Sequence, residues 1–136
     1  MRYLKCAVLS AALFFCFLSY GVGAERKEFT ASIDKDGVQR IEIIGGSYFF
    51  DPNYIIVKVN VPVEMKIRKE GVIPHDIIIQ APTAGIDVKA DLGSEWTVIT
   101  FTPTLVGTYP FYCDKKFLFL SSHREKGMEG ILDVRE

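Results

Sequence analysis

The residues of this 136-residue chain that could carry out chemistry lie mostly near its C-terminus. Nine residues separate Cys113 from His123, and four residues separate His123 from Met128. His75, the other histidine of the chain, lies 38 positions before the cysteine. A thiolate, two imidazoles and a thioether are the ligand set of a blue-copper electron-transfer site, in which methionine is a weak axial ligand. The sequence therefore predicts one copper ion bound by these four side chains.

Each of the four residues alone also has an ordinary structural explanation, because cysteine and methionine are common in cores. As a set they favour a metal, but two other kinds of site stay open. Zinc could take both histidines and the cysteine with a carboxylate as fourth ligand, from Asp76, Asp114 or Glu129. A nucleophilic cysteine with a histidine base is the other alternative, and it requires an exposed thiolate of lowered pKa.

The first 24 residues are expected to be a signal peptide that is removed on export. Arg2 and Lys5 supply its positive charge, residues 6–18 are apolar, and small residues precede the expected cleavage point after Ala24. An uncleaved membrane anchor is the alternative, because the uncharged stretch 6–24 approaches the roughly 20 residues of a membrane span. Without the anchor we expect no membrane span, and a periplasmic or other extracytoplasmic location.

Export changes what the single remaining thiol implies. Residues 25–136 contain Cys113 as their only cysteine, so no internal disulfide can form there, and a free thiol outside the cytosol is open to oxidation. A bound metal would protect it. Loss of Arg2 and Lys5 changes the net charge from −1 to −3, and this acidity gives no reason to expect a nucleic-acid partner.

Short runs with alternating apolar and polar residues, separated by Gly, Pro, Asn and Asp, predict an all-β sandwich or barrel. The predicted strands are 38–44, 54–59, 63–68, 75–79, 96–101, 107–113 and 130–134, with turns at 51–53 and 60–62. Residues 25–37 are polar and are expected to be a loose arm before a single domain, 38–136. Helical periodicity is weak, and only residues 84–92 could hold one helical turn.

Strand periodicity predicts that the candidate ligands share one end of the core. Residues two apart lie on the same face of a strand, so Phe111 and Cys113 point the same way, as do His75 and Ile77. Met128 has the parity of the inward residues of the last predicted strand. The pattern permits convergence of the four side chains.

Several segments resemble the cupredoxins, the family of plastocyanin, azurin and the copper domains of nitrite reductase and cytochrome oxidase. They are Phe-Asp-Pro-Asn-Tyr-Ile-Ile-Val at 50–57, Pro-His-Asp-Ile at 74–77 and Gly-Thr-Tyr-Pro-Phe-Tyr-Cys at 107–113, followed by His123 and Met128. The resemblance extends from about Val38 onward. It implies a Greek-key β-sandwich with one type 1 copper, and an electron carrier rather than an enzyme, whose partner is a redox protein such as a cytochrome or an oxidase.

The chain departs from the cupredoxin pattern at three points. The loop between Cys113 and His123 is longer than in small blue-copper proteins, and the absence of a second cysteine there speaks against a dinuclear copper centre. Asp76 stands where asparagine is frequent, and it could still accept hydrogen bonds that tie two loops together.

The apolar segment 117–120 could either cover the site locally or form an exposed docking patch.

Copper delivery or storage without electron transfer is the second class of function left open by the sequence. A delivery protein should hold copper at an exposed site that exchanges it readily, whereas an electron carrier should retain it.

Overall fold

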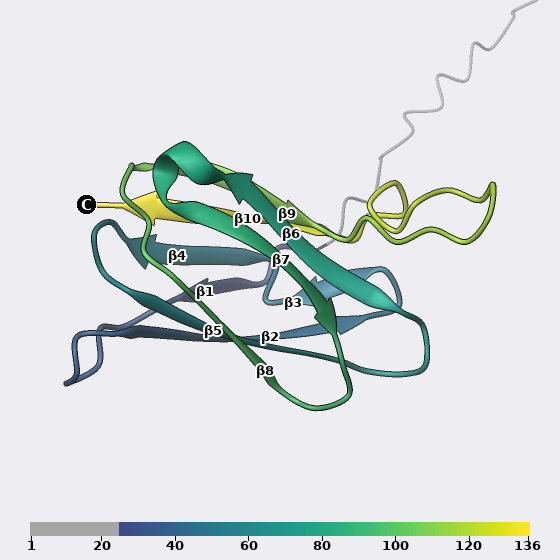
Figure 1. Ribbon diagram of the computed structural model, residues 1–136, viewed down its shortest axis with the longest axis horizontal. Helices are drawn as coiled ribbons and strands as arrows, with labels where there is room; N and C mark the ends of the chain where they lie inside the picture. Colours follow the sequence, from purple (N-terminus) through teal and green to yellow (C-terminus); the bar gives the residue numbers. More distant parts are fainter. Residues whose placement is uncertain (1–24) are drawn as a thin grey trace, which may run out of the picture.

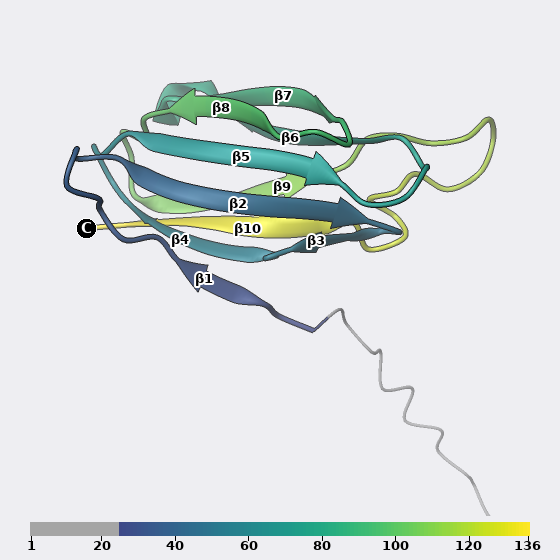
Figure 2. The ribbon, with the colours of Figure 1, turned by 90° about the horizontal axis from the view of Figure 1, so that it is seen from below.

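The computed structural model describes residues 25–136, so the predicted signal peptide lies outside the described residues. Two β-sheets pack face to face (Figures 1 and 2). The larger has the order β1-β4-β10-β9-β6-β7 and the smaller the order β3-β2-β5-β8. The elements are β1 Glu28–Thr30, β2 Gln39–Gly46, β3 Phe49–Asp51, β4 Tyr54–Lys58, β5 Val63–Lys69, β6 His75–Ala81, η1 Pro82–Ala84, β7 Ile86–Leu92, β8 Thr97–Phe101, β9 Gly107–Tyr112 and β10 Glu129–Arg135. The predicted all-β Greek-key sandwich is confirmed.

The core lies between the two sheets and follows the alternation of the sequence. In β2 and β5 nearly every second side chain is buried, and apolar residues of β6, β9 and β10 oppose them. The fully buried side chains include Ile41, Ile43, Met65, Ile67, Ile77, Ile79, Phe111 and Leu132. Both predicted turns are present, between β3 and β4 and between β4 and β5. Among residues 25–136, no helix has the length and apolar character needed to cross a membrane.

The prediction of a helical turn within 84–92 was wrong, because this segment forms strand β7. Ile86 and Val88 are buried while Asp87 and Lys89 are exposed, which is the period of a strand. The turn lies just before it, in η1, and ends at Gly85 with φ of 73°. A Cβ at this glycine would lie 2.4 Å from the carbonyl oxygen of Thr102, so a side chain there would clash with the backbone.

Part of the segment expected to be a loose arm is ordered as β1. It pairs in parallel with β4 at the edge of the larger sheet, although all three of its side chains are exposed. Backbone pairing explains its order, together with the hydrogen bond from the Lys27 amide to the Asn53 side chain, 2.8 Å long. The apolar periodicity that predicted most of the strands therefore missed β1, as it missed β3 and β7.

Strand directions bring one end of β9 to the starts of β6 and β10. β9 runs antiparallel to both neighbours, with Tyr112 paired to Glu129 of β10 and to Ile78 of β6. Cys113 directly follows β9, Met128 directly precedes β10, and β6 begins at His75. The segment that joins β9 to β10 projects from this end of the sandwich, opposite the C-terminus (Figure 1).

Candidate metal centre

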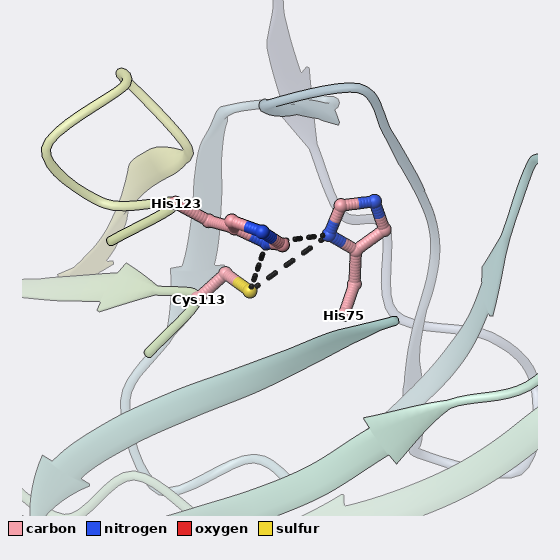
Figure 3. Close-up of side chains that lie close together, drawn as sticks. All are labelled: His75, Cys113 and His123. Carbon is pink, nitrogen blue, oxygen red and sulfur yellow. Dashed lines mark hydrogen bonds between the residues drawn. The ribbon is translucent and has the colours of Figure 1, made fainter. Parts of the chain in front are cut away.

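Three of the four predicted ligands form a compact buried cluster (Figure 3). The Sγ atom of Cys113 lies 3.4 Å from Nδ1 of His123 and 3.9 Å from Nδ1 of His75, and the two Nδ1 atoms are 3.1 Å apart. The exposed fractions of these residues are between 0% and 6%. The same ring nitrogen of each histidine thus faces the sulfur, so one ion could contact all three donor atoms.

Met128, the fourth predicted ligand, is fully buried beside the cluster. Its carbonyl oxygen accepts a hydrogen bond from the Cys113 amide at 3.1 Å, and its own amide donates to the His123 carbonyl at 2.9 Å. Its terminal methyl group packs against Gly45, where a Cβ would lie 3.2 Å from that methyl and 2.5 Å from Leu92. The absence of a side chain at Gly45 therefore leaves room for Met128.

Backbone hydrogen bonds close the base of the long loop. The His123 amide donates to the Lys115 carbonyl at 2.8 Å, and the Arg124 amide donates to the Cys113 carbonyl at 3.1 Å. The chain between residues 116 and 122 therefore leaves and returns at nearly the same place. The loop is long in sequence, but its length does not separate Cys113 from His123.

Asp76 joins the His75 strand to the Cys113 loop, as expected from the sequence. Its amide points at the Cys113 sulfur at 3.4 Å, and its Oδ1 accepts a hydrogen bond from the Asp114 amide at 2.8 Å. The residue is 5% exposed. The Nζ atom of Lys115 lies 3.9 Å from Oδ2 of Asp76 and balances the charge of this buried carboxylate. The same Nζ pairs with Asp91 at 2.7 Å.

Burial favours the neutral forms of the three clustered side chains. Burial raises the pKa of the Cys113 thiol to about 11. It also lowers the pKa of His75 to about 4, with a smaller contribution from His123 nearby. The pKa of His123 is lowered by burial and then by Lys126. Neutral imidazoles are ready to bind a metal, whereas the thiol must lose a proton to do so.

The Nε2 atom of His75 is buried and has no hydrogen-bond partner among the described residues. With the ring protonated on Nε2, Nδ1 keeps its lone pair toward the cluster, which is the tautomer a metal needs. The donor set therefore fits a metal bound through both Nδ1 atoms and the sulfur.

Tyr48 contributes to the site, and the sequence prediction missed it. It lies in the two-residue connection between β2 and β3 with φ of 66°, and its ring packs edge-on against His123 with centroids 5.0 Å apart. Lys126 donates a hydrogen bond to its hydroxyl at 3.2 Å. Positive φ is usual in such tight hairpins; the Gly45-Gly46 pair before it was the available signal for this turn.

The geometry disfavours the alternative sites. Within residues 25–136, the group of donor atoms lying within 4.8 Å of one another includes no carboxylate, so the fourth ligand proposed for zinc does not join it. Cys113 is fully buried with a raised pKa, the opposite of an exposed, activated nucleophile.

The apolar segment of the loop does not cover the site. Phe117 lines a groove of about 660 Å³ together with Tyr48, Val72 and His123, among other residues. It is 69% exposed, and Phe119 is 92% exposed. Of the two possibilities that the sequence left open, the structure has the exposed patch.

Comparison with known proteins identifies the fold. No protein-family model and no curated protein matches the sequence. Among solved structures, the metal-binding domain of the Cu(I)-exporting P-type ATPase CopA of Streptococcus pneumoniae superposes with a TM-score of 0.63 at 22% identity, covering 82% of this chain and 99% of that domain.

Two further structures extend the comparison. Auracyanin A, a blue copper protein of Chloroflexus aurantiacus, has a TM-score of 0.52 at 22% identity and covers 73% of this chain and 100% of its own. The periplasmic domain of cytochrome oxidase subunit II (CoxB) of Bradyrhizobium japonicum has a TM-score of 0.55 at 15% identity, covering 71% and 83%. With its His-Cys-His cluster at the end of a two-sheet sandwich, the chain has a cupredoxin-like fold.

Proposed function

We propose that the protein is an extracytoplasmic type 1 copper protein that carries single electrons between redox partners. The observation that carries this proposal is the buried convergence of one thiol and two Nδ1 atoms within 4.8 Å. The similarity to auracyanin A, described as a blue copper protein, supports it.

His75, Cys113, His123 and Met128 are the residues that would hold the copper ion. Bound copper would supply a one-electron Cu(II)/Cu(I) couple. The Asp76 amide donates to the Cys113 sulfur, and such hydrogen bonds to a coordinating thiolate tune its electron density. Three of the four donor atoms, the Cys113 sulfur and the two Nδ1 atoms, already face one another.

A rigid base suits electron transfer, because a site that moves little between two oxidation states has little to reorganise. Cys113 and Met128 adjoin paired strands, and the Cys113 amide donates a hydrogen bond to the Met128 carbonyl. The Asp76 side chain accepts a hydrogen bond from the Asp114 amide, which links the start of β6 to the loop after Cys113. The chain itself therefore holds the ligands in place.

Electrons would enter or leave near His123. This residue lines the groove beside Tyr48 and Phe117, whereas His75 and Cys113 are at most 1% exposed. The partner would be a redox protein such as a cytochrome or an oxidase, and the similarity to a domain of cytochrome oxidase subunit II favours a respiratory partner.

Copper delivery is the second candidate, favoured by the similarity to the metal-binding domain of a Cu(I)-exporting ATPase. A delivery site must let an acceptor protein reach the metal. In this chain all three donors are buried, and for that reason we rank delivery below electron transfer.

Copper titration tests the proposal. Cu(II) added to the metal-depleted protein is expected to produce strong visible absorption from sulfur-to-copper charge transfer, absent in Cys113→Ser and retained in the matched loop-tip variant Phe119→Ser. A colourless protein that prefers zinc would refute copper as the functional metal. Met128→Leu should keep the colour but change the reduction potential, because Met128 would be one of the residues that hold the copper.

Retention experiments distinguish the two candidate functions. A carrier should keep its copper during prolonged exposure to a chelator and give a reversible voltammetric wave. A delivery protein should lose copper to the chelator rapidly and give no stable wave.

A further inference from the structure

The tip of the long loop is a β-turn made entirely of large apolar residues. The Leu120 amide donates to the Phe117 carbonyl at 3.0 Å, so residues 117–120 close a hydrogen-bonded turn, which we call the apolar tip. Its side chains are between 50% and 92% exposed. The loop extends beyond the end of the sandwich in both views (Figures 1 and 2). No other described part of the chain presents four consecutive large apolar side chains to solvent.

The apolar tip runs against local backbone preference. Leu118 has φ of 49°, in the left-handed region that glycine and asparagine adopt far more readily than leucine. Turns of this kind are normally built from glycine, asparagine or aspartate. Neither a strained backbone nor exposed apolar surface stabilises the folded protein. Residues with strained backbones cluster at binding sites.

The charge at the root of the apolar tip is mixed, with a small positive excess. Residues 114–129 contain four basic and three acidic side chains, a net charge of +1, whereas the rest of residues 25–136 carries −4. Lys115 pairs with Asp91 and Arg124 with Glu129. Lys116, next to the tip, has no ion-pair partner among the described residues. The root of the tip therefore has a small positive excess in a domain whose net charge is negative.

We propose that the apolar tip inserts into the interfacial region of a lipid bilayer and holds the domain on a membrane surface. Phe and Leu side chains that enter the headgroup boundary, next to basic side chains, are typical of segments that bind a membrane surface. The turn satisfies one of its own backbone hydrogen bonds, which lowers the cost of entering an apolar medium. Lys116 would then lie at the level of anionic headgroups.

This inference goes beyond the proposed electron transfer and does not depend on a bound metal. Insertion would place the groove beside His123 next to the membrane surface, because Phe117 belongs both to the apolar tip and to that groove. Binding is expected to be weak and reversible, since a single small apolar anchor does not hold a protein on a membrane permanently.

Vesicle sedimentation of residues 25–136, which contain both sheets and lack the apolar stretch 6–24, tests the proposal. We expect binding to vesicles of phosphatidylcholine with phosphatidylglycerol, and weaker binding to phosphatidylcholine alone. Phe119→Asp should weaken binding about tenfold, as loss of one inserted Phe side chain predicts. The matched control is Val98→Asp, which adds the same charge at a half-exposed position on β8, and it should change binding less than about twofold.

A fluorescent reporter distinguishes tip insertion from attachment through any other part of the chain. The only tryptophan of the sequence is Trp96, so Phe119→Trp combined with Trp96→Phe gives one reporter, at the tip. Its emission should shift to the blue with vesicles and be quenched by bromine-labelled lipid chains. Trp96 in the unsubstituted chain should do neither.

The outcomes separate this proposal from the proposed function. If the reporter at position 119 neither shifts nor is quenched, tip insertion is refuted, whatever the copper chemistry. Equal loss of vesicle binding in Phe119→Asp and Val98→Asp would indicate simple charge repulsion and also refute it. Tip insertion with no copper colour would refute the proposed function and leave the membrane inference standing, so both metal-free and copper-treated protein should be measured.

Discussion

The base and the tip of one loop, only a few residues apart in sequence, differ in almost every physical respect. At the base, Cys113, His123 and Met128 are buried and linked by backbone hydrogen bonds. At the tip, Phe119 is 92% exposed and Leu118 has a strained backbone. The hydrogen bond between the His123 amide and the Lys115 carbonyl separates the two regions.

This difference explains how a long ligand loop can still build a compact site. The core and the strand ends fix the base, so residues 116–122 can vary in length and composition without moving the donor atoms. Because every side chain of the tip is at least half exposed, its apolar character needs an explanation outside folding. Substitutions that compare the two regions should reveal this division.

The largest contrast is expected between two Phe→Ala substitutions. Phe111 is fully buried, packs edge-on against Phe50 and precedes Cys113 by two residues, so Phe111→Ala should lower the free energy of unfolding by about 3–5 kcal/mol. Phe119→Ala at the tip should change it by less than about 0.5 kcal/mol. Urea unfolding of the metal-free protein measures both. Similar losses in the two variants would contradict the proposed separation of base and tip.

Acidification of the metal-free protein should destabilise the base. Between the ordinary pKa of 6.5 and the folded value of about 4, the unfolded chain binds a proton at His75 that the folded chain does not. Stability therefore rises with pH across this window and is lost as pH falls. The full difference corresponds to about 3 kcal/mol, and because water entry and relaxation reduce it we expect about 2 kcal/mol.

Urea unfolding in the presence of a chelator, at pH 7 and at pH 4, measures this loss. The control is His75→Asn, in which the dependence on pH should become clearly shallower. An unchanged slope in this variant would show that other groups cause the acid sensitivity.

Removal of the Asp76 carboxylate should loosen the link between the two ligand loops. Asp76→Ala leaves the Asp114 amide without its acceptor and should cost about 1–2 kcal/mol of unfolding free energy. Asp76→Asn keeps an acceptor oxygen and should lose less than half as much. If both variants are equally destabilised, the charge of Asp76 rather than its hydrogen bond is what matters.

At the tip, one substitution is expected to stabilise the protein instead of destabilising it. Leu118→Asn places a residue that tolerates φ near 49° in the strained position, so we expect the protein to gain up to about 1 kcal/mol of stability. Thermal unfolding measures the gain. Phe119 does not have a positive φ, so Phe119→Asn should give no such gain.

Strand periodicity predicted most of the fold because most strands bury alternate side chains. It failed for β7, where the buried Ile86 and Val88 are spaced by charged residues that also suit a helix surface, and for β1, whose exposed side chains carry no apolar pattern. The tie between Asp76 and the Cys113 loop was predicted from a family resemblance. Tyr48 was not, because no sequence rule places a hairpin residue beside a histidine 75 positions later.

The sequence by itself determined which donor atoms are present and that their strands alternate, since residue types and period-two patterns are local properties. The tertiary structure alone decided that β9 runs against both β6 and β10, which brings His75 and Cys113 to one end of the sandwich. It also decided that Phe117–Leu120 lies in solvent rather than over the site. Both outcomes depend on contacts between segments far apart in the chain, and these form only when the whole domain packs.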